Sequence, residues 1–312
     1  MSQPPPSSHA RTVAVAALAT GFVLFVLAIV LALTSGDGGG GGGDEGTRAG
    51  ATTATTKRPA KPPARKQPAL ATEPAVPANA PGAHKAPEEA VPVLAYGVIN
   101  EPRSDTADPS IWVPPEEFRE QMAYLADNGY HPVTMRQLWA AWKDGGLLPD
   151  KPIVISFDTG YHSVHSNALP ILRERQFPAT LFLALRQTEA DFPASEVKAL
   201  IGAGWELGGQ PSGEGDITSA SEEQLDQAIG GARRELQRQF GRRVEFMSYP
   251  DGRFDDRVAS AAESSGFLGA MTLEEGLASP EEPPYELDRI PVRNGDGEDG
   301  LARKLESVAQ GQ

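Results

Sequence analysis

The sequence predicts an α/β fold in residues 91–312: about seven parallel strands forming a barrel, with helices covering them. Two observations predict it. Short apolar segments alternate with segments whose apolar residues recur at helical spacing. The apolar segments lack the alternation of polar and apolar residues that is typical of a strand with one solvent-exposed face. This indicates strands that are covered on both sides. With this many strands, a closed barrel is favoured over an open sheet.

The predicted strands are short apolar runs bounded by turn residues or helix signals. They lie at residues 91–95, 153–157, 179–184, 205–207, 244–249, 267–271 and 287–292. Runs of this length are typical of buried strands rather than helices.

The helices between them are indicated by the spacing of apolar residues and by end signals. The first covers 115–128, with Phe118, Met122 and Leu125 on one face and Gly129 as a stop. Further helices are predicted at 134–143, around 168–172, at 195–203, after the capping box of Ser221 and Gln224, and from Asp255.

Residues 12–34 carry no charge, and a helix of this length crosses a bilayer core of about 30 Å. A cleavable signal peptide is the alternative, but its apolar region is usually shorter. We expect an uncleaved transmembrane signal anchor at 12–34, behind a short cytoplasmic tail at 1–11. Arg11 before the run and acidic residues after it indicate that the C-terminal part is exported.

Residues 35–90 show no apolar periodicity and predict a disordered linker rich in Gly, Pro and Ala. It begins with the unbroken glycine run at 38–43. From Arg48 to Lys66, both included, it has six basic residues and no acid. These fit either a solvated spacer or a contact with anionic membrane or wall polymer, and both interpretations stay open.

Composition excludes several classes of function. The net charge of −14 argues against binding nucleic acid through electrostatics. The absence of cysteine removes disulfides, thiolate metal sites and cysteine nucleophiles. Imidazole chemistry is restricted to five positions: His9, His84, His131, His162 and His165.

One segment places polar residues where a buried strand ends, which is where parallel folds bind ligands. It reads SFDTGY from Ser156 to Tyr161, followed by ALPIL and ATLFL. An acid at such a position is commonly a turn or cap residue. However, these blocks resemble, in order and spacing, the first motif of the polysaccharide deacetylase family, the NodB-homology domain of carbohydrate esterase family 4. The segments VPVLAYGV, GWELGGQPSGEGD and MSYPDGRFDD resemble further family blocks.

The resemblance implies a deacetylase-like (β/α) barrel and assigns roles to individual residues. The family holds a divalent metal with one Asp and two His, and a preceding Asp acts as base on the metal-bound water. Carried over, Asp158 takes the base position, while Thr159, Gln210 and Glu214 stand at the metal-ligand positions. Asp251 replaces an aromatic residue of the third motif.

These substitutions predict a weakened or absent metal site. Of the three, only Glu214 is an anionic ligand of the kind zinc prefers. We therefore expect no metal cofactor, and Asp158 alone is a weak base for amide hydrolysis. His162 and His165, just after Asp158, could form a replacement site with it, but histidines at a polar helix start are more often surface residues.

The remaining pocket is predicted as a substrate groove. Its candidate residues are Thr159, Tyr161, Gln210, Glu214, Tyr249 and Asp251, and the two tyrosines fit core packing equally well. The expected partners are a cell-envelope glycan or an envelope protein, and the membrane through 12–34, but no nucleic acid. The expected location is a bacterial cell membrane, crossed once, with the C-terminal domain extracytoplasmic.

Two functions follow from the resemblance. The first is a pseudoenzyme that binds glycan or an envelope protein, with weak or no metal-dependent deacetylation. The alternative is an active hydrolase of the C–N bond of N-acetyl groups in envelope polysaccharide. It would use a non-standard site with a zinc-type divalent metal. A purely structural role has no residue in its support.

Overall fold

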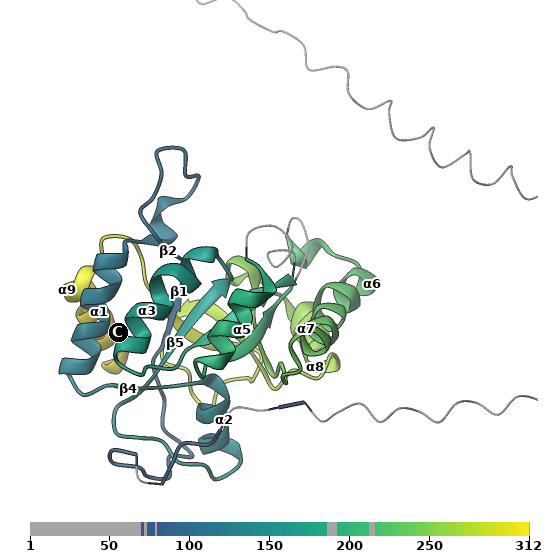
Figure 1. The fold of residues 1–312 in the computed structure, drawn as a ribbon. Coiled ribbons are helices and arrows are strands. Elements are labelled where there is room, and N and C mark those ends of the chain that lie inside the picture. The colour runs from purple at the N-terminus through teal and green to yellow at the C-terminus, as the bar shows by residue number, and fades with distance from the viewer. Residues whose placement is uncertain (1–69, 72–73, 79, 186–191, 212–215, 312) are drawn as a thin grey trace, which may run out of the picture. The chain divides into compact units, whose positions relative to one another are not determined.

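The computed structural model describes residues 70–71, 74–78, 80–185, 192–211 and 216–311 (Figure 1). The predicted tail at 1–11, the predicted anchor at 12–34 and the linker as far as residue 69 lie outside these residues. Within the described part of the chain, no helix is long and apolar enough to span a membrane.

A closed parallel barrel of seven strands forms the centre of the fold, as predicted. The ring runs β1 (Val93–Tyr96), β10 (Leu287–Pro291), β9 (Gly269–Glu275), β8 (Phe246–Ser248), β7 (Glu206–Gln210), β6 (Thr180–Ala184) and β5 (Pro152–Thr159), and β5 returns to β1. Closure rests on Leu94, which is in register with Ile290 on one side and Ile155 on the other. An eighth strand, β4 (His131–Val133), pairs with the start of β5, and β2 (Val98–Ile99) pairs with β3 (Trp112–Val113) apart from the barrel.

Helices lie around the barrel in the described part of the chain (Figure 1). They are α1 (Pro115–Asp127), α2 (Met135–Lys143), α3 (Leu169–Glu174), α5 (Ala194–Gly202), α6 (Glu222–Leu225), α7 (Ala232–Phe240), α8 (Asp256–Ser264) and α9 (Gly297–Ala309). The predicted starts agree with the caps: Ser221 makes the capping box, and Asp255 accepts from the backbone N–H of Val258. The sequence reasoning missed α9, which packs against α1.

Successive side chains along each strand point alternately out of the barrel and into it. The buried apolar residues therefore form an outer core, between the barrel and the helices, and an inner core, inside the barrel. Phe157 points outward, where its ring stacks on Trp205 at 5.1 Å beneath the helices. The inner core contains Val154, near the start of β5, and Phe182 of β6, and it packs against α2 through residues such as Leu138. Helix α2 therefore closes the amino end of the barrel, and the carboxyl end is left for a site.

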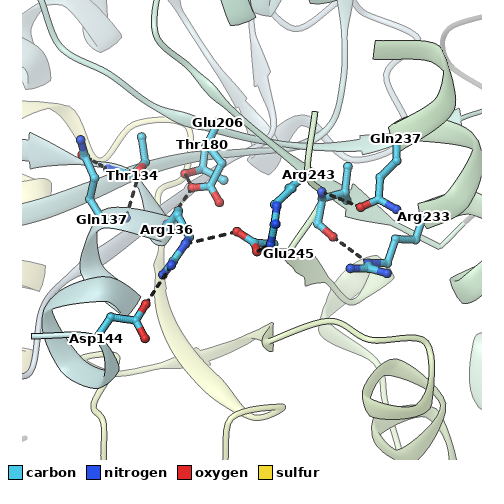
Figure 2. Close-up of polar contacts among 11 residues, drawn as sticks. Thr134, Arg136, Gln137, Asp144, Thr180, Glu206, Arg233, Gln237, Arg243 and Glu245 are labelled. Carbon is cyan, nitrogen blue, oxygen red and sulfur yellow. Dashed lines mark hydrogen bonds and ion pairs between the residues drawn. The ribbon is translucent and has the colours of Figure 1, made fainter. Parts of the chain in front are cut away.

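Polar contacts hold α2 in that place (Figure 2). The backbone N–H of Arg136 donates to the buried carboxylate of Glu206, at the start of β7, over 3.0 Å. The guanidinium of Arg136 pairs with Asp144 at 2.8 Å and with Glu245, just before β8, at 3.2 Å. Charge-assisted contacts of this kind fix orientation as well as adding stability.

The folded chain begins earlier than the predicted boundary at residue 91. We call residues 74–78 and 80–90 the strap. Its His84 exchanges two backbone hydrogen bonds of 2.9 Å with Leu148, and the carbonyl of Glu89 accepts from the indole N–H of Trp142 over 2.8 Å. Ala86 is buried in the inner core. This part of the predicted linker is therefore packed against the domain, because α2 and the loop after it supply partners that composition does not reveal.

His84 is expected to make the stability of the strap depend on pH. Its Nδ1 and Nε2 each lie 2.9 Å from an acceptor, the carbonyl of Gly82 and the carboxylate of Glu89, and Asp150 lies 4.0 Å away. The hydrogen bond to Glu89, followed by that to Gly82, raises the pKa of His84 above 6.5. A raised folded-state pKa adds stability that is fully present below pH 6.5 and is lost as pH rises through the raised value.

Urea unfolding tests this expectation. The midpoint of the wild type should fall between about pH 5.5 and about pH 8.5, and the fall should be smaller in His84→Gln and in Glu89→Gln. An identical pH dependence in the wild type and both variants would contradict it.

Candidate active site

The candidate residues meet at the carboxyl end of the barrel because the strands that carry them are all parallel. Asp158 and Thr159 end β5, Gln210 ends β7 and Ser248 ends β8. Arg289 lies in β10, which is far from these strands in the sequence, but its side chain contacts Asp158.

Asp158 is held in a buried ion pair. The Nη1 and Nη2 of Arg289 each donate to one oxygen of its carboxylate over 2.8 Å. The Arg289 side chain is fully buried, while that of Asp158 is 16% exposed. The guanidinium also donates to the Thr272 carbonyl and to the Ser156 hydroxyl. The carboxylate at the predicted base position is thus neutralised by a guanidinium that is held in place by its burial.

Beside this pair lies an uncharged chain of hydrogen bonds. The Thr159 hydroxyl donates to Oε1 of Gln210 over 2.9 Å, and Nε2 of Gln210 donates to Ser248 Oγ over 3.2 Å. Gln210 and Ser248 are buried, and Thr159 is half-buried. The strand ends therefore present hydroxyl and amide groups where the family resemblance puts metal ligands.

The backbone at Thr159 is strained. Its φ is +69°, in the left-handed region that β-branched residues rarely adopt, and Gly160 follows with φ +87°. The positive φ of Gly160 favours glycine, and a Cβ there would also meet Cδ1 of Leu183 at 2.5 Å. Strain of this kind is concentrated at functional sites, where the surrounding structure maintains it.

The described donors do not fit a zinc ion. A hydroxyl and an amide oxygen are neutral, and here they already bond to each other, whereas zinc takes imidazole, thiolate or carboxylate ligands. Glu214, the anionic member of the predicted set, lies outside the described residues. Among the residues the structure describes, no three His, Cys, Asp or Glu side chains are grouped to hold a metal.

The two histidines that follow Asp158 turn toward a different carboxylate. Nδ1 of His162 lies 2.8 Å from Glu196 of α5, and Nδ1 of His165 lies 3.9 Å from it. Their side chains are 58% and 31% exposed. They are therefore surface residues paired with Glu196, as the simpler of the two interpretations predicted.

One of the two aromatic candidates lies in the core rather than in a groove. Tyr249 is fully buried: its ring stacks on Phe254 at 4.7 Å, and its hydroxyl donates to the Tyr285 carbonyl. Burial raises the pKa of Tyr249 well above its ordinary value. Its placement in the groove is corrected to the core. Tyr161 is half-buried against the outer core, and Asp251 is exposed with φ +52°.

Comparison with known proteins identifies the family. Residues 146–270 match the family model described as polysaccharide deacetylase. We therefore call the folded part of the chain, which resembles this family, the deacetylase domain. The resemblance predicted from the motifs is thereby confirmed, although the match covers the centre of the chain rather than its whole length.

Two curated relatives of this deacetylase domain illustrate the range of similarity. YxkH of Bacillus subtilis, whose name assigns it to the polysaccharide deacetylases, is 24% identical over 220 residues, which cover 70% of this chain and 77% of that protein. The poly-beta-1,6-N-acetyl-D-glucosamine N-deacetylase of Escherichia coli is 45% identical over 62 residues, which cover 20% of this chain and only 9% of that protein.

Solved structures share the fold of the deacetylase domain. The Streptococcus pyogenes deacetylase PplD, solved with acetate, aligns with a TM-score of 0.65 at 22% identity, over 70% of this chain and 99% of that chain. IcaB from Ammonifex degensii aligns with a TM-score of 0.60 at 20% identity, over 70% of this chain and 97% of that chain. At this identity the alignments establish the barrel and nothing finer.

Sequence reasoning missed two polar residues of the deacetylase domain's site, Arg289 and Ser248. One signal for Arg289 was available: it lies beside Asp288 in a short strand whose other residues are Leu287, Ile290 and Pro291, and a charged residue in a buried strand needs a partner. Ser248 had no comparable signal, because a serine at the end of a strand is ordinary.

Proposed function

We propose that the deacetylase domain binds an N-acetylated cell-envelope glycan and carries out weak or no metal-dependent deacetylation. One observation carries this proposal. Two of the three positions that the family resemblance assigns to metal ligands hold Thr159 and Gln210, whose side chains bond to each other over 2.9 Å. Neutral side chains that already hydrogen-bond to each other are weak metal ligands.

The state of Asp158 supports the same proposal. A bound metal would supply an activated water and polarise the amide carbonyl, which are the two effects this reaction needs most. Without them, the carboxylate would act alone as base, and both of its oxygens already accept from Arg289. The lack of an activated water and the fixed orientation of the carboxylate toward Arg289 both work against amide hydrolysis.

The choice of ligand rests on the relatives and on the chemistry of the barrel mouth. Several relatives are named as deacetylases of poly-beta-1,6-N-acetyl-D-glucosamine, a glycan with neutral hydroxyl and acetamide groups. Hydroxyl and amide side chains at the mouth match such groups by hydrogen bonding. An envelope protein is the other partner considered, and no described residue favours it.

The proposed location follows the sequence expectations. The uncharged run at 12–34 would anchor the protein in a bacterial cell membrane, and the residues after it would act as a tether. The deacetylase domain would then lie outside the cytoplasm, where envelope glycans are found. Protease treatment of intact spheroplasts tests this: the domain should be cleaved without lysis.

Elemental analysis and acetate release test the proposed loss of deacetylation. The purified chain should contain less than one zinc, cobalt or manganese per molecule when each metal is supplied. Acetate release from N-acetylglucosamine oligomers should stay at background, and Asp158→Asn should leave it unchanged. One metal per chain, together with acetate release that requires Asp158, would instead establish the alternative of an active C–N hydrolase.

A converse experiment tests the assignment of positions. The triple change Thr159→Asp, Gln210→His and Glu214→His supplies one carboxylate and two imidazoles, and should bind one divalent metal per chain. If this variant folds and still binds no metal, the assignment of these three positions is wrong.

A further inference from the structure

Residues 276–286, which the structure describes throughout, join β9 to β10 as a loop rather than as a helix. We call them the β9–β10 loop. Its backbone is tied to the domain at two places. Ala278 exchanges hydrogen bonds of 2.8 and 3.1 Å with Val91, and the carbonyl of Pro284 accepts from the N–H of Ala270 over 2.9 Å. The loop is therefore held against the two strands that it connects.

The side chain of Asp288 points out of the barrel and lies under this loop. Its neighbours in β10 point inward: Leu287 belongs to the inner core, and Arg289 makes the ion pair of the site. The carboxylate of Asp288 lies against the backbone of Gly276, where an added Cβ would meet Oδ2 at 2.3 Å. The Thr272 hydroxyl donates to Oδ1 over 3.5 Å. An acid is thereby held half-buried between β10 and the loop.

Glu282 brings a second carboxyl group to the same place. Its Oε2 accepts from the backbone N–H of Ser279 over 2.5 Å, which fixes the side chain within the loop. Its carboxyl group also forms a hydrogen bond with the carboxyl group of Asp288. A hydrogen bond between two carboxyl groups requires a proton on one of them, whereas two ionised carboxylates at this distance repel each other.

The charged groups around this pair favour keeping the proton. Burial, followed by the negative charge of Glu274 in β9, raises the pKa of Asp288. Burial above all, helped by the charge of Asp288, raises the pKa of Glu282 to about 7. Basic side chains of the adjoining elements are engaged elsewhere: Lys143 of α2 donates to a loop carbonyl over 3.2 Å, and Arg289 pairs with its carboxylate inside the barrel. The other charged residues of the loop and of the end of β9 are exposed acids: Glu275, Glu281 and Glu286.

We propose that one proton shared by Glu282 and Asp288 holds the β9–β10 loop closed over the outer face of these strands, and that loss of this proton loosens the loop. The inference does not depend on the proposed glycan binding. It does concern the strands that hold the site, because the Thr272 carbonyl accepts from Nε of Arg289 over 2.7 Å.

The direction of the pH response follows from the carboxyl pair. In the opened loop the carboxyl group of Glu282 is solvated and ionises near its ordinary pKa of 4.5, whereas in the closed loop it keeps its proton up to about pH 7. The closed loop is therefore favoured at low pH. Opening becomes easier as pH rises from 4.5 to about 7 and changes little above that.

Hydrogen exchange of the full-length chain at about pH 5 and about pH 7.5 tests the proposal. After correction for the intrinsic pH dependence of exchange, the β9–β10 loop should open at least about fivefold more at the higher pH. Glu282→Gln should remove this increase, because its amide N–H donates to Asp288 at every pH. Glu281→Gln, at the exposed neighbouring position, is the matched control and should behave like the wild type.

Carbon-13 resonances of labelled glutamate carboxyl groups measure the proton directly. One resonance should titrate near pH 7, disappear in Glu282→Gln and remain in Glu281→Gln. A Glu282 that titrates at its ordinary value would overturn the proposal, and so would an unchanged rise in loop exchange in Glu282→Gln. Should that variant fail to fold, Asp288→Asn provides the same exchange test, since its amide N–H donates to Glu282.

Discussion

Arg289→Met is expected to lower the free energy of unfolding by about 3–5 kcal/mol. The side chain of Arg289 is fully buried and makes hydrogen bonds to Asp158, Ser156 and the Thr272 carbonyl. Removing it leaves the mostly buried carboxylate of Asp158 without its counter-charge, and the penalty of such a group exceeds the loss of packing. Urea unfolding followed by circular dichroism measures the change.

A double-mutant cycle separates the ion pair from the size of the side chain. Asp158→Asn in the Arg289→Met background should restore part of the stability, because the neutral amide costs less to bury unpaired. Arg119→Met is the control: Arg119 pairs with Glu174 at the surface, with side chains 42% and 56% exposed, and should cost less than about 1 kcal/mol. An Arg289→Met effect as small as this control would contradict the prediction.

Deletion of the strap is expected to have the second largest effect. A chain beginning at Val91 should be less stable than one beginning at Lys66 by about 2–4 kcal/mol. It loses the His84–Leu148 backbone pair and the acceptor of the Trp142 indole N–H, and it uncovers the apolar contacts of Ala86. The buried indole N–H would then need water, which opens the amino end of the barrel.

Limited proteolysis and thermal unfolding of the two truncated chains measure this effect. The chain beginning at Lys66 should behave like the full-length protein, since residues from 66 onward form one compact unit. The chain beginning at Val91 should unfold several degrees lower and be cut within α2, which the strap covers. Equal unfolding temperatures for the two chains would show that the strap does not contribute to stability.

The barrel could be predicted because the patterns that indicate its strands and helices are made by residues close together in the sequence. Apolar runs such as 153–157 and 179–184 are continuous, so they indicate strands buried on both faces without any knowledge of their partners. Helix starts were predictable for the same reason: the capping box at Ser221 and the cap at Asp255 are made within four residues of chain. β4 and α9 escaped because the first is very short and the second follows loop residues without a cap signal.

The site was predictable only in part. The order of the family blocks identified the residues at the carboxyl ends of β5 and β7, and Thr159 and Gln210 do lie together there. The role of Tyr249 was not predictable, since a tyrosine after a strand fits a groove or a core equally well. Its burial depends on Phe254 and on Tyr285, which belongs to a different loop.

By itself the sequence determined the barrel strands, most helices and the resemblance to the deacetylase family, because each of these is carried by residues close together in the chain. The tertiary structure decided that Asp158 is paired with Arg289, which is 131 positions away, and that the strap belongs to the folded domain. Contacts of this kind depend on closure of the barrel, which brings distant strands together. No local pattern records them, because the partner of a buried charge or of an indole N–H is set by the geometry of the whole fold.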